Sequence, residues 1–269
     1  MSQKGAVRRP RVRPPLVVSL LGGLGLAFFA IPLIGLMTRV PWSELGQVLT
    51  DDVTLDALRR SAITSLVTTA ISMVIGIPLA WIIARAEFAG RSVMRGLVLL
   101  PLILPPVVGG ASLLFAMGRR GVLGGPLYDA TGLVLPFSTW GVIVATTFVA
   151  MPFMVLTVEG ALRGLDRRYE GAAATLGAEP LTVMRRVTLR MIGPSLAAGA
   201  VLTWARAFGE FGATLTFAGN LQGRTQTLPL AVYVALESDR DAAVVISLLM
   251  VIVSVAVLLV MRDRWWRAL

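Results

Sequence analysis

Two charged residues, Arg206 and Glu210, stand in an otherwise apolar stretch of the sequence. They are four residues apart, so on a helix their side chains face the same way and can form an ion pair. If that stretch crosses a membrane, a lone charge there costs about 2.5–3.5 kcal/mol on insertion scales, so the pair should point into protein or water. Two roles remain open: a structural ion pair that fixes helix packing, or a group that lines a path for a charged solute.

Most catalytic chemistry is excluded by the residue types that the sequence lacks. It contains no Cys and no His, which excludes disulfide frameworks, thiol nucleophiles, zinc fingers and His-dependent triads. Its only lysine is Lys4, so it has no P-loop and no internal Schiff-base lysine. No predicted membrane helix carries a pair of carboxylates on one face. We therefore predict no catalytic residue and no metal site.

The elements that position Arg206 and Glu210 are predicted to be membrane helices. Of the 269 residues, 56% are hydrophobic and 15% are charged, and the mean hydropathy is +0.78. A helix needs about twenty apolar residues to cross a membrane. Five windows of that length lack Asp, Glu, Lys and Arg: 16–38, 61–84, 96–118, 130–158 and 242–261. Residues 195–218, which contain the charged pair, are expected to form one further helix, giving an all-α integral membrane protein with six spans.

The distribution of basic residues tests this number of spans. With six spans and an inside N-terminus, 17 of the 25 basic residues fall in inside segments. Arginine and lysine are enriched on the cytoplasmic side of membrane proteins, so we predict that both termini are cytoplasmic. The basic run 8–13 directly precedes the first span, and we interpret it as a topology signal, with no nucleic-acid partner.

The longest predicted inside loop, residues 159–194, has a helical pattern in two parts. Apolar residues recur every three or four positions before Gly177, at Leu162, Leu165, Tyr169, Ala172 or Ala173, and Leu176. Gly177 is placed to end one helix and Pro180 to begin the next. The second apolar face is predicted to consist of Leu181, Met184, Val187 and Met191. The pattern alone leaves two interpretations open: a pair of helices lying on the inner leaflet, or an element that docks another protein.

A family resemblance favours docking. The run 170–177, Glu-Gly-Ala-Ala-Ala-Thr-Leu-Gly, followed by Val187-Thr188-Leu189, resembles the EAA loop of type-I ABC-transporter permeases, Glu-Ala-Ala-x3-Gly-x9-Ile-x-Leu-Pro. Here Gly171 replaces the Glu of that pattern and Arg190 replaces its Pro. The resemblance implies that this loop couples to a cytoplasmic ATPase. The residues that it assigns to coupling are Tyr169, Glu170, Gly171, Ala172, Ala173, Leu176, Gly177, Val187 and Leu189.

Other stretches resemble a narrower group. Residues 100–110, 118–121, 208–214 and 219–229 are similar to the permease subunits of molybdate ABC transporters, and the 208–214 stretch is shared with tungstate and sulfate permeases. The resemblance implies the type-I importer permease fold over residues 57–260. It leaves 1–56 as basic tail, first span and external loop, and 261–269 as cytoplasmic tail. The implied function is oxyanion import, with molybdate first and sulfate or tungstate as alternatives.

The resemblance also implies the partners. Because the chain has no internal half-length repeat, a two-fold pathway requires a homodimer, accompanied by an ABC ATPase dimer and an extracytoplasmic binding protein. This chain is then not an enzyme and binds no cofactor, since ATP and Mg²⁺ belong to the ATPase. Path or gate candidates are Arg206, Glu210, Phe211, Thr214 and Asn220. Candidates for contact with the binding protein are Arg119, Arg120 and Arg224.

A second class of function stays in view, namely a secondary transporter or channel driven by an ion gradient. Such proteins usually place several charged groups at membrane depth, whereas this sequence has one Arg–Glu pair there. A membrane scaffold or enzyme is the third class, and the sequence offers it no catalytic constellation.

Overall fold

The computed structural model describes residues 15–265, with side chains through residue 259, and every regular element within that range is helical. The elements are α1 (Leu16–Thr38), α2 (Leu45–Thr50), α3 (Asp52–Arg85), α4 (Arg91–Ile103), α5 (Pro106–Met117), α6 (Gly124–Thr131), α7 (Thr139–Gly164), α8 (Arg168–Thr175), α9 (Pro180–Val183), the π-helical turn η1 (Met184–Thr188), α10 (Leu189–Met191), α11 (Gly193–Phe208), α12 (Gly212–Ala218), α13 (Leu228–Ser238) and α14 (Arg240–Trp265). The predicted all-α fold is confirmed. The basic tail before residue 15 and the end of the predicted C-terminal tail lie outside the described residues.

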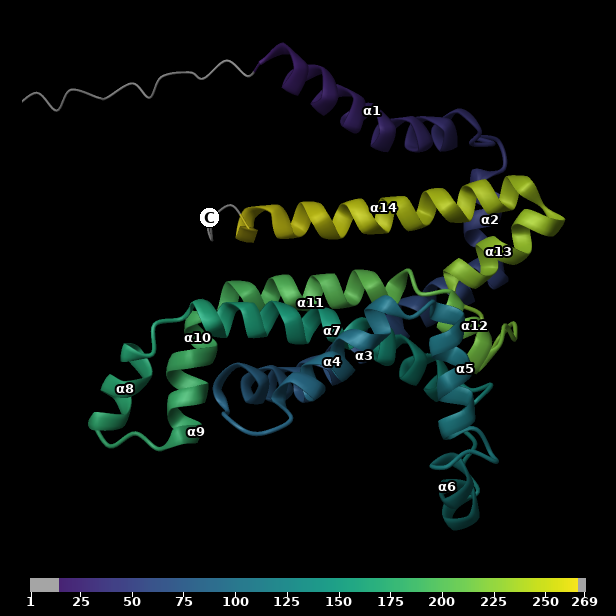
Figure 1. Ribbon diagram of the computed structural model, residues 1–269. Coiled ribbons are helices and arrows are strands. Elements are labelled where there is room, and N and C mark those ends of the chain that lie inside the picture. The colour runs from purple at the N-terminus through teal and green to yellow at the C-terminus, as the bar shows by residue number, and fades with distance from the viewer. Residues whose placement is uncertain (1–14, 266–269) are drawn as a thin grey trace, which may run out of the picture.

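Among the described residues, four helices are long and apolar enough to cross a membrane. They are α1, α3, α7 and α14, and two bent helix pairs raise the number of possible spans to six. The connection between α8 and α9 lies at one end of the molecule, where α1 begins and α14 ends (Figure 1). We call this the elbow end. Helices α6 and α13 lie at the opposite end (Figure 1).

The centre of the molecule is built from α3, α7 and α11. Helices α3 and α7 are joined by Thr68 and Thr146, whose hydroxyl oxygens are 2.6 Å apart. One further contact links all three helices, because Met154 of α7 fills the space left by two glycines. A Cβ on Gly76 of α3 would lie 3.3 Å from Met154 Cγ, and a Cβ on Gly199 of α11 would lie 3.2 Å from Met154 Sδ. Small residues therefore allow the three backbones to approach closely, as in other membrane bundles.

The prediction of one continuous span over residues 96–118 is wrong. The segment lies in two helices, α4 and α5, whose axes differ by 120°. The reason is the Pro105-Pro106 pair at the break. Proline lacks a backbone N–H and disfavours the helical conformation for the residue before it, and two successive prolines do so at two successive positions, so α4 ends and α5 begins with Pro106 in its first turn. The window 130–158 also began too early, since α7 starts at Thr139 after a connector.

The prediction of a single helix over residues 195–218 is also wrong. Helix α11 ends at Phe208 and α12 begins at Gly212, so Arg206 lies in the last turn of α11 and Glu210 lies in the break. The charged side chain explains the break, because Glu210 Oε1 accepts a hydrogen bond from the backbone N–H of Ala213 at the start of α12. The second bent pair instead joins residues 180–191 to α11, at an angle of 76°.

Candidate functional site

Residues 165–192 form a folded arm at the elbow end, which we call the elbow segment. It turns sharply at Gly177, whose φ of 81° belongs to the left-handed region that glycine adopts most easily. The backbone N–H groups of Gly177 and Ala178 donate to the carbonyl oxygens of Ala174 and Ala173, at 3.0 and 3.1 Å. This pairing closes the C-terminus of α8. Pro180 then opens α9, so the predicted elbow between two short helices is confirmed.

The first predicted apolar face does not exist as one surface. Leu162 is buried in α7, but α7 ends at Gly164, and Asp166 starts a separate helix by accepting a hydrogen bond from the N–H of Arg168 at 3.0 Å. Beyond that turn the apolar residues face outward, with Tyr169 half exposed and Leu176 exposed to 89%. The apolar spacing continues through the turn, although the helix axis changes direction there. Periodicity in a sequence does not report such a change, so it predicted one continuous face.

The second predicted face is corrected by the π-helical turn η1. The N–H of Leu189 donates to the carbonyl oxygen of Met184, five residues earlier, instead of the usual four. The extra residue per turn rotates the residues that follow. Met191, which follows the turn, is exposed, and so is Leu181, which precedes it, while Thr188 faces inward.

The predicted coupling residues divide into an outer and an inner set. Outward-facing are Tyr169, Gly171, Ala172, Leu176 and Gly177, and nothing lies within 4 Å of where a Cβ would stand on either glycine. Ala173, Val187 and Leu189 are partly buried.

Glu170 belongs to the inner set. Its Oε1 accepts a hydrogen bond from Thr188 Oγ1 at 2.8 Å and pairs with Arg85 Nη2 at 3.3 Å. The sequence did not reveal Arg85 and Thr188 as partners of Glu170, because they lie 85 and 18 positions away from it.

A second carboxylate near the elbow end was also missed. Glu159 of α7 is 2% exposed and pairs with Arg163 at 2.7 Å and with Arg95 at 3.4 Å. Arg95 comes from α4, so this carboxylate ties the first half of the bent α4–α5 pair to α7. Two arginines around one buried carboxylate explain why a charge persists inside an apolar helix.

The predicted pairing of Arg206 with Glu210 is confirmed, although the two residues do not share a helix. Arg206 Nη1 contacts Glu210 Oε2, and the other carboxylate oxygen accepts from Ala213 at 2.8 Å. Glu210 is buried, whereas Arg206 is partly exposed. Both carboxylate oxygens are thus engaged by the chain itself, which gives Glu210 a structural role whatever else it does.

The other path candidates lie along α12 and the connector that follows it. Phe211 packs against Tyr233 of α13 with ring centres 5.2 Å apart. The Thr214 hydroxyl and the side-chain amide oxygen of Asn220 are buried, and neither has a hydrogen-bond partner among the described residues. Helix α5 crosses α12 tightly at Gly110, where a Cβ would stand 2.7 Å from the carbonyl oxygen of Ala213. This crossing holds α12, and therefore Thr214, against α5.

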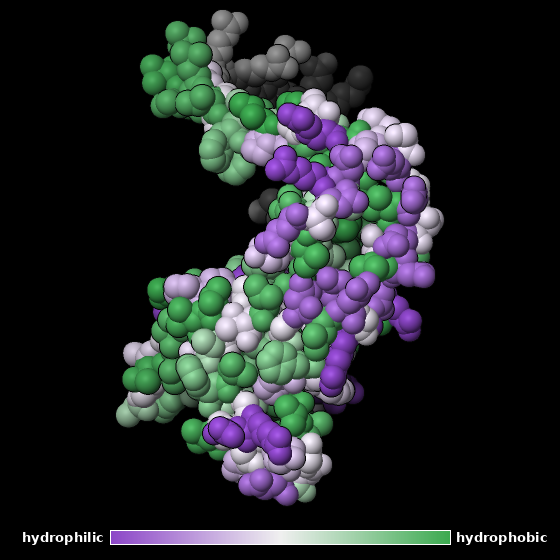
Figure 2. Space-filling view, turned by 90° about the vertical axis from the view of Figure 1, so that its right-hand side faces the viewer, coloured by the Kyte–Doolittle hydropathy of each residue, from purple (hydrophilic) through white to green (hydrophobic). Residues whose placement is uncertain are grey.

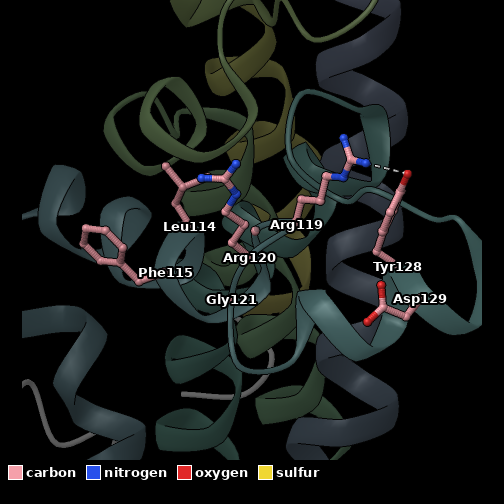
Figure 3. A pocket seen from close by; sticks show the side chains of 8 residues that line it. Leu114, Phe115, Arg119, Arg120, Gly121, Tyr128 and Asp129 are labelled. Carbon is pink, nitrogen blue, oxygen red and sulfur yellow. Dashed lines mark hydrogen bonds between the residues drawn. The ribbon is translucent and has the colours of Figure 1, made fainter.

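Arg119 and Arg120 lie in the connection between α5 and α6, at a cavity of about 700 Å³ (Figure 3). The guanidinium group of Arg119 lies 4.1 Å from the centre of the Tyr128 ring and donates to the Tyr128 hydroxyl at 2.7 Å. Arg120 points away from Tyr128 (Figure 3). Tyr128 was not among the predicted site residues, yet its ring and hydroxyl hold Arg119 in place.

The structure separates Arg224 from these two arginines. Arg224 does not line their cavity, and it lies in the connector between α12 and α13. Its backbone carbonyl oxygen accepts hydrogen bonds from Arg60 at 3.1 Å and from Thr139 at 3.2 Å, while the residue itself is exposed. The three predicted contact arginines therefore lie on two different connectors.

An acidic cavity of about 550 Å³ lies between α2, α3, α13 and α14. Its lining includes Glu44, Asp51 and Asp239 and no basic residue. Asp51 and Asp239 both accept backbone hydrogen bonds at the starts of helices, α3 and α14 respectively.

Figure 2, which views the end opposite the elbow, shows polar side chains gathered along one side of this end and a deep notch on the other.

Comparison with known families identifies the chain. The family described as "binding-protein-dependent transport system inner membrane component" matches residues 76–267. The chain belongs to this family. It is therefore a multi-pass permease of the cytoplasmic membrane, the membrane-spanning subunit of an ABC transporter.

Curated relatives narrow the group around this permease. It is 47% identical over 242 residues to a molybdenum transport system permease protein of Mycobacterium bovis, covering 89% of this chain and 90% of the relative. A probable molybdenum ABC transporter permease of Haloferax volcanii is 38% identical, with 90% and 87% covered. A sulfate transport system permease protein of Salmonella typhimurium is 34% identical, with 88% of each chain covered.

Solved structures support the fold of this permease. A chain of a bacterial ABC transporter that imports the polysaccharide alginate matches with a TM-score of 0.75 and 16% identity, covering 94% of this chain and 95% of that one. A chain of the methionine transporter MetNI in an inward-facing conformation matches with a TM-score of 0.58 and 20% identity, covering 81% and 99%. At these identities the likeness concerns the fold alone.

Proposed function

We propose that this permease carries molybdate inward across the cytoplasmic membrane as part of an ATP-driven importer. The observation that carries the proposal is the 47% identity, over nine tenths of the chain, to a molybdenum transport permease. The sulfate permease that matches over a similar length is less similar, at 34%. Sulfate and tungstate, which are also tetrahedral oxyanions, are the alternative substrates.

The charges in the membrane fit a conduit for an anion better than a tight binding site. Arg206 attracts an oxyanion, but Glu210 contacts Arg206 directly and offsets its charge. A permease that receives its substrate from another protein must also release it, and deep binding would slow the release. Thr214 and Asn220 add uncharged polar groups close to this pair in the sequence.

The energy source in this proposal is a separate ATPase dimer. The only lysine is Lys4, so the chain has no P-loop of its own, and ATP with Mg²⁺ belongs to the ATPase. The outward-facing residues of the elbow segment form the surface on which the ATPase docks. Leu176 and Leu181 are exposed there beside the small residues Gly171 and Ala172, which let a groove of the partner approach the α8 backbone. ATPase closure would then rock the spans between two arrangements.

Two further partners complete the proposal. A second copy of this chain forms the pathway with it, since one chain has no internal repeat. The apolar side chains that α5 exposes, including Val107 and Phe115, are available for that contact. An extracytoplasmic binding protein delivers the oxyanion, and Arg119, Arg120 and Arg224 are the contacts that we assign to it.

The test is uptake of radioactive molybdate by proteoliposomes that contain the permease, its ATPase and the binding protein. We expect uptake that requires ATP and the binding protein, and that unlabelled molybdate suppresses at lower concentration than sulfate. Stronger suppression by sulfate or tungstate would transfer the assignment to that oxyanion. Uptake by the permease alone that persists without ATP and collapses with the ion gradient would replace the importer by a secondary transporter.

A further inference from the structure

We propose that Glu170 is a positioning residue that ties the elbow segment to α3, so that α3 moves together with the docked ATPase. This inference rests on the proposed function, because it assigns a route by which docking reaches the membrane helices. It concerns the one acidic side chain of α8. That side chain faces into the molecule and not toward a partner.

The Glu170 carboxylate joins three elements through one oxygen. Oε1 accepts the hydrogen bond from Thr188 of η1 at 2.8 Å and pairs with Arg85 at 3.3 Å. Thr188 is 1% exposed and the Arg85 side chain 9%, so water competes little for either contact. Hydrogen bonds to a charged group in such surroundings are stronger than those between neutral groups.

The position of Arg85 shows how its contact with Glu170 can transmit movement to α3. Arg85 is the last residue of α3, which runs without a break from Asp52. The elbow segment continues directly into α7 and α11 along the chain, but it has no such covalent link to α3. Among the described residues, the pair of Arg85 with Glu170 is the ion pair that joins α3 to the elbow segment. Apolar packing also links the two, since Ile192 of the elbow segment shares a buried cluster with Ile83 and Ala84 of α3, and the ion pair adds a charged contact to that packing.

The π-helical turn supports a specific role for Thr188. The widened turn ends at Thr188, whose side chain is buried, whereas Met191 beyond it is exposed. π-Turns are rare and often mark functional positions. Here the irregular turn directs a hydroxyl group at the Glu170 carboxylate.

The exposed face of α8 and the side chain of Glu170 have different roles in this proposal. Tyr169 and Gly171, the neighbours of Glu170, are exposed, and Gly171 stands where the family pattern has its Glu. Small and apolar side chains thus meet the ATPase, and the acidic group acts inside this chain.

The experiment compares variants of the complete transporter in proteoliposomes, with ATP hydrolysis and molybdate uptake measured together. Glu170→Gln removes the charge, and Thr188→Val removes the hydroxyl at nearly constant volume. We expect both variants to retain the ATPase and to hydrolyse ATP, but to import about two- to tenfold less molybdate per ATP. The matched controls are Thr188→Ser, which keeps the hydroxyl, and Glu87→Gln, which changes an exposed acid just after α3 and outside the elbow segment. Both should resemble the wild type.

Unchanged molybdate import per ATP in Glu170→Gln and Thr188→Val would overturn the proposal. Loss of the ATPase from Glu170→Gln, with Thr188→Val unaffected, would also overturn it, because Glu170 would then contact the partner. If the wild-type complex shows no ATP-driven uptake, the proposed function fails. Hydrogen exchange of residues 168–175 in the permease then decides about Glu170. Faster exchange in Glu170→Gln and Thr188→Val but not in Thr188→Ser supports the tie, and unchanged exchange refutes it.

Discussion

Arg60 of α3 donates a hydrogen bond to the backbone carbonyl oxygen of Arg224 at 3.1 Å, although the two residues are 164 positions apart in the sequence. Arg60 also contacts the carbonyl oxygen of Gly223 and pairs with Asp56 at 2.9 Å. The connector that carries Arg224 is therefore fixed on the same helix whose other end meets the elbow segment at Arg85. One long helix thus contacts the connector at one end of the molecule and the elbow segment at the other.

Replacing Arg60 by Met should loosen this connector. The change removes two hydrogen bonds from a charged donor to backbone carbonyl groups, each of which contributes about 1.5–3 kcal/mol. We expect faster hydrogen exchange in residues 219–227, with little change in α7. Arg59→Met is the matched control, because Arg59 is the exposed neighbour on the same helix. Equal exchange in the two variants would contradict an anchoring role for Arg60.

The crossing of α5 and α12 should not tolerate even one added carbon. In Gly110→Ala the new Cβ would stand 2.7 Å from the Ala213 carbonyl oxygen and 2.8 Å from Thr216 Cβ, so one helix must shift. We expect a destabilisation of about 1–3 kcal/mol, the usual cost of overpacking, visible as a lower thermal midpoint in detergent.

A glycine in open space provides the comparison for Gly110. Gly96 of α4 has nothing within 4 Å of where its Cβ would stand. Gly96→Ala should be neutral or slightly stabilising, since alanine favours the helix. If Gly110→Ala behaves like Gly96→Ala, the tight crossing is not a determinant of stability.

The sequence was sufficient to predict the helices whose apolar windows are continuous. The window 16–38 coincides with α1, and the elbow at Gly177 was predicted because glycine and proline act on their own backbone. The breaks at Pro105 and at Glu210 were not predicted. A search for long uncharged windows considers only charge and length. It therefore predicts one helix across a proline pair, and it does not recognise that a carboxylate such as that of Glu210 can cap a new helix.

Contacts between residues far apart in the sequence are the part of the candidate site that could not be predicted. The pairing of Arg206 with Glu210 followed from a spacing of four residues. The contacts of Glu170 with Arg85 and Thr188 depend on how three elements fold together, and no spacing in the sequence reveals them. Helix α13 was missed for a simpler reason, because its eleven residues are fewer than a membrane span requires.

The exposed apolar tip of the elbow segment should matter for ATPase binding and not for folding. Leu176 is 89% exposed, so Leu176→Asp should leave thermal stability unchanged while it reduces co-purification of the ATPase at least about tenfold. Val122→Asp changes a residue that is 83% exposed in the connection between α5 and α6, and should have no such effect. Retained association in Leu176→Asp would count against docking at this surface.

The pairing of Arg206 with Glu210 can be assigned a structural or a path-lining role by one substitution. Glu210→Gln keeps an oxygen that can accept from the Ala213 N–H but leaves the partly buried Arg206 without its counter-charge. A structural role predicts a loss of about 1–3 kcal/mol in stability, with uptake reduced only in proportion to the folded protein. Because the added net positive charge attracts oxyanions more strongly, a path-lining role predicts instead a normal thermal midpoint with tighter substrate retention and slower release. Glu237→Gln, an exposed acid of α13, is the control. Since both Glu210 oxygens are already engaged within the chain, we expect the first result.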